Sequence, residues 1–389
     1  MHTQERNPKN RRWLNVAVLL VVVALTAWLW HRMSQRNGPP VSTGTTATNA
    51  VASIITRPPQ PVPSDNSKFK LQEFTARLNA APDAKTAQPQ LAELRAALAA
   101  MSTNEAVAEM RRFLDSRADA ATRLGFKVTA SGALDEAPTL RTFLLDEMAR
   151  LDPVAAAEYA KVILASKDSP DEWAVALRNL AQGDASAEGR ALLEQKTGEL
   201  LRHEAWQREP SVGYLEAFDT AVFVGGTNLL PALSDLLRRK DNQAVAHASF
   251  LTLDRLVIND AAPMLAALQA APEWMEGREQ TRANYFARGD VRDARQREVL
   301  ENYFSNPKLG AAELEAFAGT FPNANFMISA NLLTQNRTTD HATLAARDAE
   351  SLRVVQQWMA DPRFAKQRPA LEKISRRLGE FVRQASQAK

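Results

Sequence analysis

Histidine is the first residue type to consider for acid–base or metal chemistry, and the chain has five. The segment His203-Glu204-Ala205-Trp206-Gln207 begins like the HExxH metal-binding helix, in which two histidines one helical turn apart bind zinc. Gln207 stands where the second histidine is required, so the zinc site is incomplete. We therefore interpret His203 as a half-exposed helix residue.

Other patterns that carry chemistry are missing from the sequence. It contains no GxSxG, P-loop or GxGxxG motif, and the absence of cysteine excludes disulfides, thiolate metal sites and a Cys nucleophile. Adjacent carboxylates such as Asp146 and Glu147 diverge on a helix, whereas acid–base catalysis needs two groups facing one cleft. We therefore predict a protein that is not an enzyme, with no catalytic, metal-binding or cofactor-binding residues.

A run of arginines between residues 278 and 297 is the strongest candidate for an anion or partner contact. Arginine beside aromatic side chains such as Tyr285 and Phe286 can bind phosphate or a polyanion. Acidic residues are mixed in at spacings that allow ion pairs, so an exposed, salt-bridged helix is the alternative. The candidate contact residues are Arg278, Arg282, Arg288 and Arg292.

Residues 13–30, WLNVAVLLVVVALTAWLW, carry no charge. As a helix they would span ~27 Å, close to the ~30 Å hydrocarbon core of a bilayer. A cleaved signal peptide is the alternative, but the run is long and ends in bulky and then basic residues. We expect an uncleaved transmembrane helix that contacts the lipid bilayer. Its expected membrane-interface residues are Trp13, Trp28, Trp30, Arg11, Arg12 and Arg32.

The charge is concentrated at the N-terminus. The chain has a net charge of +3, yet residues 1–36 hold six basic residues and one acidic residue, which leaves −2 for the remainder. The basic charge therefore does not indicate nucleic-acid binding. More basic residues precede the apolar run than follow it, which favours a cytoplasmic N-terminus and a periplasmic or otherwise extracytoplasmic C-terminal domain.

The chain divides into four parts by composition. The segment 31–67 is rich in Pro, Ser and Thr and cannot bury a core, so we expect a disordered linker. Helix signals then recur to the end of the chain. The predicted parts are a basic tail (1–12), a transmembrane anchor (13–30), the linker (31–67) and an all-helical, repeat-like domain (68–389).

Helix starts in the last part are marked by capping residues. Ser102 and Glu105 form a capping-box pattern, and Asp152-Pro153, Ser169-Pro170 and Asp361-Pro362 each place a cap before a first-turn proline. Residues 125–138 are an exception and predict either a short hairpin or an irregular loop. The basic segment 361–389 is amphipathic, which is typical of a final capping helix or of a helix that contacts anionic lipid.

A repeated helical hairpin is clearest at residues 228–270. The segments LLPALSDLL (229–237) and AAPMLAALQ (261–269) begin 32 residues apart and align Pro231 with Pro263. This stretch resembles HEAT or armadillo-type repeats in its early proline, its Asp/Asn turn and the apolar start of the second helix at Val245. The resemblance implies a stacked helical solenoid that acts as a binding scaffold, with no chemistry of its own.

The fold class expected from these patterns is all-α, with one N-terminal transmembrane helix, a disordered linker and a HEAT-like solenoid. We expect a membrane-tethered, non-catalytic interaction scaffold of the cell envelope that binds proteins or peptides, with envelope proteins as partners. An envelope or cell-wall-acting enzyme whose site is assembled from scattered residues is one alternative. A cytoplasmic body that binds a polyanion through the arginines at 278–297 is the other.

Overall fold

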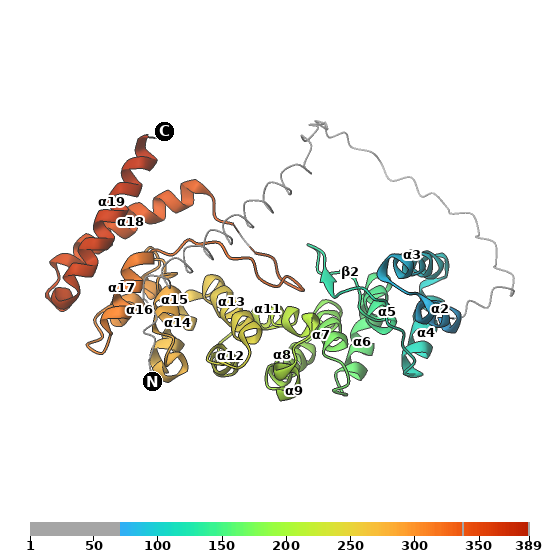
Figure 1. Cartoon of the computed structure of the whole chain (residues 1–389). Coiled ribbons are helices and arrows are strands. Elements are labelled where there is room, and N and C mark those ends of the chain that lie inside the picture. The colour runs from blue at the N-terminus through green and yellow to red at the C-terminus, as the bar shows by residue number, and fades with distance from the viewer. Residues whose placement is uncertain (1–70, 337, 388–389) are drawn as a thin grey trace, which may run out of the picture. The chain divides into compact units, whose positions relative to one another are not determined.

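The computed structural model describes residues 71–336 and 338–387, and this part of the chain is mostly helical (Figure 1). Its residues belong to one compact unit, Ser67–Lys389. The α-helices are α2 (Leu71–Ala80), α3 (Ala84–Ala100), α4 (Thr103–Asp115), α5 (Leu140–Leu151), α6 (Pro153–Ile163), α7 (Pro170–Gly183), α8 (Ala187–Leu201), α9 (Glu204–Arg208), α10 (Val212–Glu216), α11 (Asp219–Val224), α12 (Leu230–Leu237), α13 (Gln243–Asn259), α14 (Ala261–Ala270), α15 (Glu279–Phe286), α16 (Ala294–Phe304), α17 (Ala311–Thr320), α18 (His341–Ala360) and α19 (Arg368–Gln387). Two 3-10 helices, η1 (Pro272–Met275) and η2 (Pro362–Gln367), complete the helical elements.

The predicted capping residues begin the helices as expected. Ser102 and Glu105 form a complete capping box at the start of α4. Asp152 caps α6 and Ser169 caps α7, each directly before a proline in the first turn. Asp361 caps η2, which is a short 3-10 helix directly before α19.

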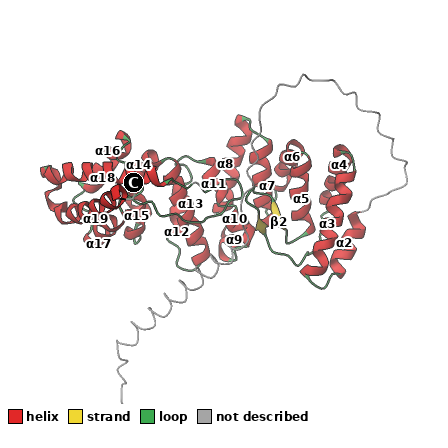
Figure 2. Ribbon diagram, turned by 90° about the horizontal axis from the view of Figure 1, so that it is seen from above, coloured by secondary structure: helices red, strands yellow, loops and turns green. Residues whose placement is uncertain are grey.

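The helices follow one another as packed neighbours, so the body has the α-solenoid-like character that the repeat pattern predicts (Figure 2). The clearest predicted hairpin is confirmed as α12 and α13, joined by a polar turn in which Asn242 caps α13. The chain then begins α14 directly after Asp260. Buried apolar residues from successive helices form one continuous core, to which Trp173, Trp206 and Trp358 contribute.

A small antiparallel hairpin resolves the ambiguous segment 125–138. Strand β1 (Lys127–Val128) pairs with β2 (Leu134–Glu136), and Gly132 in the turn has a φ of +86°. At the other end of the body, α19 packs against α17, α18 and η2 and buries Leu371, Ile374 and Leu378. The C-terminal segment is therefore packed as a final helix of the body.

The predicted anchor, residues 13–30, lies outside the described residues. Within the ranges 71–336 and 338–387, no helix is both long and apolar enough to cross a membrane. The two longest helices, α18 and α19, have 20 residues each and carry charged side chains along their length. The predictions of a transmembrane fold class and of a single-pass membrane location are therefore corrected: the structure supports an all-α body, and none of its described helices could span a membrane.

Candidate binding face

A long segment between α17 and α18, named the 321–340 loop and described except at residue 337, interrupts the helical pattern (Figure 1). The loop extends from the end of α15, across α13 and α11, to the β-hairpin. At the hairpin, the Asn331 side-chain amide donates to the Thr129 carbonyl at 3.3 Å, and that of Gln335 donates to the Ala130 carbonyl at 3.0 Å. The loop therefore joins parts of the body that are about 200 residues apart in sequence.

A buried ion pair between Asp219 of α11 and Arg255 of α13 lies beneath this loop. The Arg255 Nη1 and Asp219 Oδ1 atoms are 2.9 Å apart, and the two side chains are 8% and 0% exposed. Asp219 starts α11, and Arg255 faces it from the middle of α13, so helix packing brings both charges to one surface. Burying two charges is costly unless their remaining hydrogen-bonding capacity is satisfied.

The loop supplies these additional hydrogen bonds, half of them from its backbone and half from two hydroxyl groups. The amides of Leu333 and Thr334 both donate to Asp219 Oδ2, at 2.6 and 2.7 Å. Arg255 Nη1 donates to the Ala330 carbonyl at 2.7 Å and to the Ser329 hydroxyl at 3.0 Å, and the Thr334 hydroxyl contacts both charged side chains. The main-chain contacts depend on the path of the chain and not on its sequence, whereas the hydroxyl contacts require Ser329 and Thr334.

A second buried pair holds the start of the loop. Arg288, which follows α15, contacts Asp254 of α13 through two bonds of 2.9 Å, and both side chains are almost fully buried. Arg288 Nη1 also donates to the Asn323 carbonyl at 3.3 Å, and Arg347 of α18 donates to the same oxygen at 3.1 Å. The start of the loop is thus held through its backbone, as its middle is.

A third buried pair supports the hairpin that the loop reaches. Arg178 of α7 lies 2.6 Å from Asp146 of α5 and donates to the Gly132 carbonyl at 2.8 Å. Gly132 lies directly against the loop, since a Cβ added there would be 2.4 Å from the Leu332 carbonyl oxygen. The Leu332 side chain is completely buried and fixes the far end of the loop by apolar packing.

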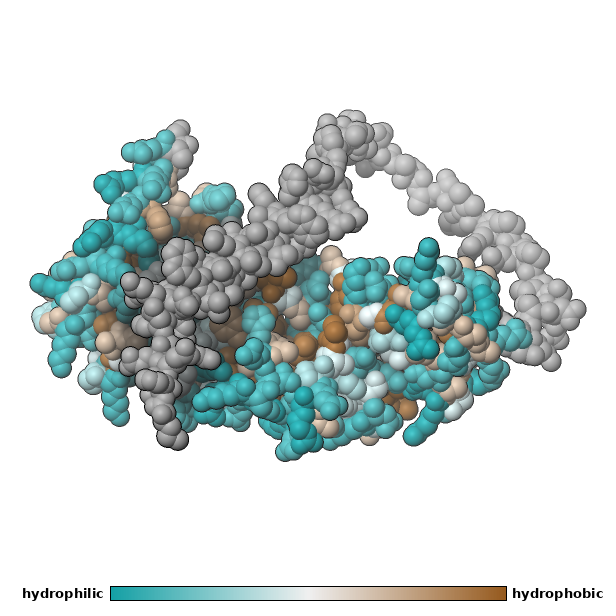
Figure 3. Space-filling view, viewed as in Figure 1, coloured by the Kyte–Doolittle hydropathy of each residue, from teal (hydrophilic) through white to brown (hydrophobic). Residues whose placement is uncertain are grey.

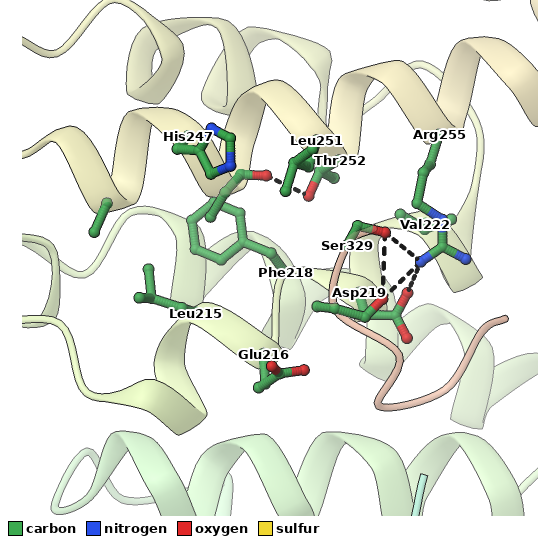
Figure 4. A pocket seen from close by; sticks show the side chains of 13 residues that line it. Leu215, Glu216, Phe218, Asp219, Val222, His247, Leu251, Thr252, Arg255 and Ser329 are labelled. Carbon is green, nitrogen blue, oxygen red and sulfur yellow. Dashed lines mark hydrogen bonds and ion pairs between the residues drawn. The ribbon is translucent and has the colours of Figure 1, made fainter. Parts of the chain in front are cut away.

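We define the loop-binding face by Glu216, Asp219, Leu251 and Arg255. A cavity of about 220 Å³ opens on it, beneath Ser329 and Ala330 of the loop (Figure 4). The cavity walls are mostly apolar and come from α10, α11 and α13, with Glu216 and His247 at polar positions in them. Figure 3 shows apolar side chains gathered in the middle of the body, with hydrophilic residues around them.

Burial affects the acidic groups of this face. It raises the pKa of Asp219, although the hydrogen bonds from Thr334 and Leu333 and the charge of Arg255 oppose the shift. It also raises the pKa of Glu216, with a smaller opposing effect from the Asn331 amide. The Glu216 Oε2 atom is buried and has no hydrogen-bond partner. Of the two carboxyl groups, Glu216 therefore has fewer hydrogen-bond partners for its oxygen atoms.

The predicted arginine run does not form one surface. Arg278 donates to the Arg239 carbonyl at 3.5 Å, while Arg282 is buried against Tyr303 and pairs with Glu313 at 3.6 Å. Arg288 and Arg292 line a polar cavity of about 570 Å³ beneath the loop, and each pairs with an aspartate. The run is also divided between α15 and α16, because the chain turns at 287–293 instead of continuing one exposed helix.

The predicted membrane-interface residues lie outside the described part of the chain. These are Trp13, Trp28, Trp30, Arg11, Arg12 and Arg32. His203, the residue of the incomplete zinc motif, caps α9 and stacks on Trp206 with 3.9 Å between ring centres. Within residues 71–336 and 338–387, no group of three or more histidine and acidic side chains is arranged to hold a metal ion.

Sequence reasoning did not identify the central residues of this face. A weak signal existed in the buried pairs, since Asp146–Arg178, Asp219–Arg255 and Asp254–Arg288 are separated by 32, 36 and 34 residues, close to the hairpin period. A second signal was the 20-residue loop itself, because loops of this length in compact domains are commonly functional.

The chain was compared with protein-family models, with curated proteins and with solved structures. No family model matches it, and neither does a curated protein or a solved structure. The structure supports the coarse part of the repeat resemblance, namely many packed helices compatible with a helical-repeat fold. No family match supports the finer assignment to the HEAT or armadillo class or the membrane anchor.

Proposed function

We propose that this protein is a non-catalytic scaffold that binds peptide segments of other proteins on its loop-binding face. The observation that carries the proposal is the way this face already holds a non-helical segment of its own chain, which bends at Leu332 and Leu333. Asp219 accepts two backbone amides, and Arg255 donates to a backbone carbonyl and a hydroxyl. Charged groups paired with main-chain atoms suit peptides of varied sequence.

The helical architecture supports the same proposal. Stacked helical hairpins create long surfaces on which several successive helices contact one ligand. We assign the hairpins around α12–α14 to HEAT-like repeats, on the 32-residue offset between LLPALSDLL and AAPMLAALQ and on the similar spacing of the three buried Asp–Arg pairs. Each pair joins neighbouring hairpins, which keeps the peptide-binding groups in register along the body.

A peptide-binding experiment tests the proposal. The ligand is a fluorescein-labelled peptide with the sequence of residues 323–336, NANFMISANLLTQN. The protein is the full-length chain carrying Leu332→Asp, because a charged side chain cannot occupy the buried site of Leu332 and the loop should leave the face. Fluorescence anisotropy should show saturable binding, tighter to L332D than to the unmodified chain.

The matched control adds Asp219→Asn to the same protein. This change keeps the shape of the side chain and removes its charge, so two charge-assisted hydrogen bonds to the peptide weaken. We expect at least a tenfold loss of affinity, since hydrogen bonds to charged groups contribute ~1.5–3 kcal/mol each. No binding to L332D, or equal binding with and without Asp219→Asn, would refute the proposed function.

A second candidate function rests on the cavity beneath the loop. Glu216, whose pKa is raised by burial, and His247 both line it, so an acid–base site assembled from residues distant in sequence is the alternative. Hydrolysis of a nitrophenyl ester by the full-length chain, abolished by Glu216→Gln and by His247→Ala, would support an enzyme. Equal background rates for the chain and both variants would count against it.

A further inference from the structure

The 321–340 loop fills its binding face unevenly. Leu332 is completely buried, whereas two and three residues earlier the loop places the small residues Ala330 and Ser329 over the cavity. A space of about 220 Å³ remains beneath them, walled by apolar side chains that include Leu215, Val222 and Leu251. The loop thus fills one apolar site with the Leu332 side chain. It places no large side chain in the neighbouring site, which is the cavity.

The cavity is large enough for a ring-sized side chain. Apolar cavities of ~150 Å³ in proteins bind benzene. A large apolar side chain that enters the cavity would gain packing contacts and part of its transfer free energy, because helices form the walls while one side stays open to solvent. The small side chains of Ser329 and Ala330 gain little of either. A peptide with a large side chain at this position should therefore bind this face more tightly than the loop does.

The backbone contacts fix where that side chain would stand. Arg255 binds the Ala330 carbonyl and the Ser329 hydroxyl, and Asp219 binds the Leu333 and Thr334 amides. Any segment that made the same contacts, with the same bend, would place the residues equivalent to Ser329 and Ala330 above the cavity and the residue equivalent to Leu332 in the buried leucine site. The spacing between these two apolar sites is thereby set at two or three residues.

We propose that the 321–340 loop is a weak occupant of its own binding face. The partner is a peptide that bends as the loop does, with an aromatic side chain at the position of Ala330 or Ser329, two or three residues before a leucine-sized residue. This inference rests on the proposed function above and names its ligand class. The loop and the partner peptide compete for the same Asp219–Arg255 pair. Binding of the partner accordingly requires the loop to leave the face.

The test compares three labelled peptides of residues 323–336 on the L332D chain: the natural sequence, Ala330→Phe and Ser329→Phe. At least one phenylalanine peptide should bind about tenfold more tightly than the natural peptide, which corresponds to ~1.4 kcal/mol. If all three bind equally, the cavity does not receive the side chain and the inference is overturned, while the proposed function stands. If none of the three peptides binds, the inference and the proposed function are both refuted.

A second measurement does not depend on the folding of L332D. Ala330→Phe and Ser329→Phe, introduced singly into the otherwise unmodified full-length chain, should place the ring in the cavity from the chain's own loop. For at least one of them, hydrogen exchange of the Leu333 and Thr334 amides should slow severalfold and the melting temperature should rise. Faster exchange in both variants would overturn the inference.

A second copy of the chain is the other conceivable occupant. If loops were exchanged between copies, light scattering of the unmodified protein would show twice the chain mass, and the phenylalanine peptide would dissociate this dimer. We expect the mass of a single chain with and without the peptide, and a dimer that the peptide dissociates would overturn the proposal of a separate partner.

Discussion

Asp219 and Arg255 are 36 residues apart in sequence, and their side chains form a buried ion pair with 2.9 Å between Oδ1 and Nη1. Both groups also hydrogen-bond to the 321–340 loop, Asp219 through the amides of Leu333 and Thr334 and Arg255 through the Ala330 carbonyl. The pair therefore joins α11 to α13 and at the same time binds the backbone of a distant loop. This double role explains how a costly buried pair is satisfied.

Breaking the pair should destabilise the protein and release the loop. Arg255→Met leaves Asp219 buried without its cation, for which we expect a loss of ~3–5 kcal/mol in urea unfolding. Hydrogen exchange of the Leu333 and Thr334 amides should accelerate more than that of amides in α5. The matched control is Arg295→Met, whose side chain is 80% exposed; it should change stability by less than ~0.5 kcal/mol. Equal effects of the two changes would contradict this prediction.

Leu332 should anchor the loop, and Ile328 should not. Leu332 is completely buried, whereas Ile328 is 79% exposed on the same loop. Leu332→Ala should cost ~2–5 kcal/mol of loop docking and make residues 326–336 exchange faster in hydrogen-exchange mass spectrometry. Ile328→Ala should leave exchange unchanged. An unchanged exchange pattern in Leu332→Ala would show that its packing does not hold the loop.

Gly132 should be required for close packing of the loop on the hairpin. Gly132 and Gly277 both have positive φ, +86° and +69°, so alanine is strained by ~1 kcal/mol or more at either position. Only at Gly132 would the new Cβ also meet the loop, since nothing lies within 4 Å of the corresponding atom at Gly277. Gly132→Ala should therefore lower the melting temperature more than Gly277→Ala and speed exchange at residues 329–334. The same loss in both variants would point to backbone strain alone.

Glu216 should make stability depend on pH. Burial raises the pKa of Glu216 in the folded protein, so the folded state loses stability as the pH rises through that range. Glu216→Gln removes this effect while its carbonyl can still accept the Asn331 amide. We expect the variant to be more stable near pH 8, because it no longer buries a charge at this position. Thermal melts should show the charge-dependent difference vanishing at about pH 3, below the ordinary pKa of a glutamate carboxyl. A difference that does not vary with pH would contradict the prediction.

Arg288 should be structural, in contrast to Arg292 of the same run. The Arg288–Asp254 side chains are 6% and 4% exposed, whereas the Arg292 side chain is 38% exposed in its pair with Asp290. Arg288→Met should cost ~3–5 kcal/mol, because it leaves Asp254 buried and unpaired. Arg292→Met should cost less than ~1 kcal/mol. Urea unfolding of the two variants measures the difference, and comparable losses would show that burial does not separate the two arginines.

Local signals in the sequence predict the helical body well. Ser102, Asp152 and Ser169 cap helices where the sequence places them, because a capping hydrogen bond depends on residues at most three positions away. The hairpin at 125–138 could not be distinguished from an irregular loop, since its strands have only two and three residues. The transmembrane fold class, predicted from residues 13–30, is not supported by any helix of the described ranges.

The binding face could not be predicted because its residues meet only through packing. With 48 basic and 45 acidic residues, a single sequence offers far too many charge pairs to select Asp219 with Arg255. The same limit applies to Leu332, whose neighbour Gly132 is 200 residues away. The arginines at 278–297 were conspicuous in sequence, yet the chain folds them into separate pairs with Asp254, Asp290 and Glu313.

Backbone recognition by Asp219 is the central claim, and methylation of a single peptide amide tests it most directly. Two versions of the 323–336 peptide would be measured on the L332D chain, one N-methylated at Leu333 and one at Ile328. Methylation at Leu333 removes a hydrogen bond to Asp219 Oδ2, so we predict at least a tenfold loss of affinity, while methylation at Ile328 leaves affinity within about twofold. Equal affinities of the two methylated peptides would contradict the account.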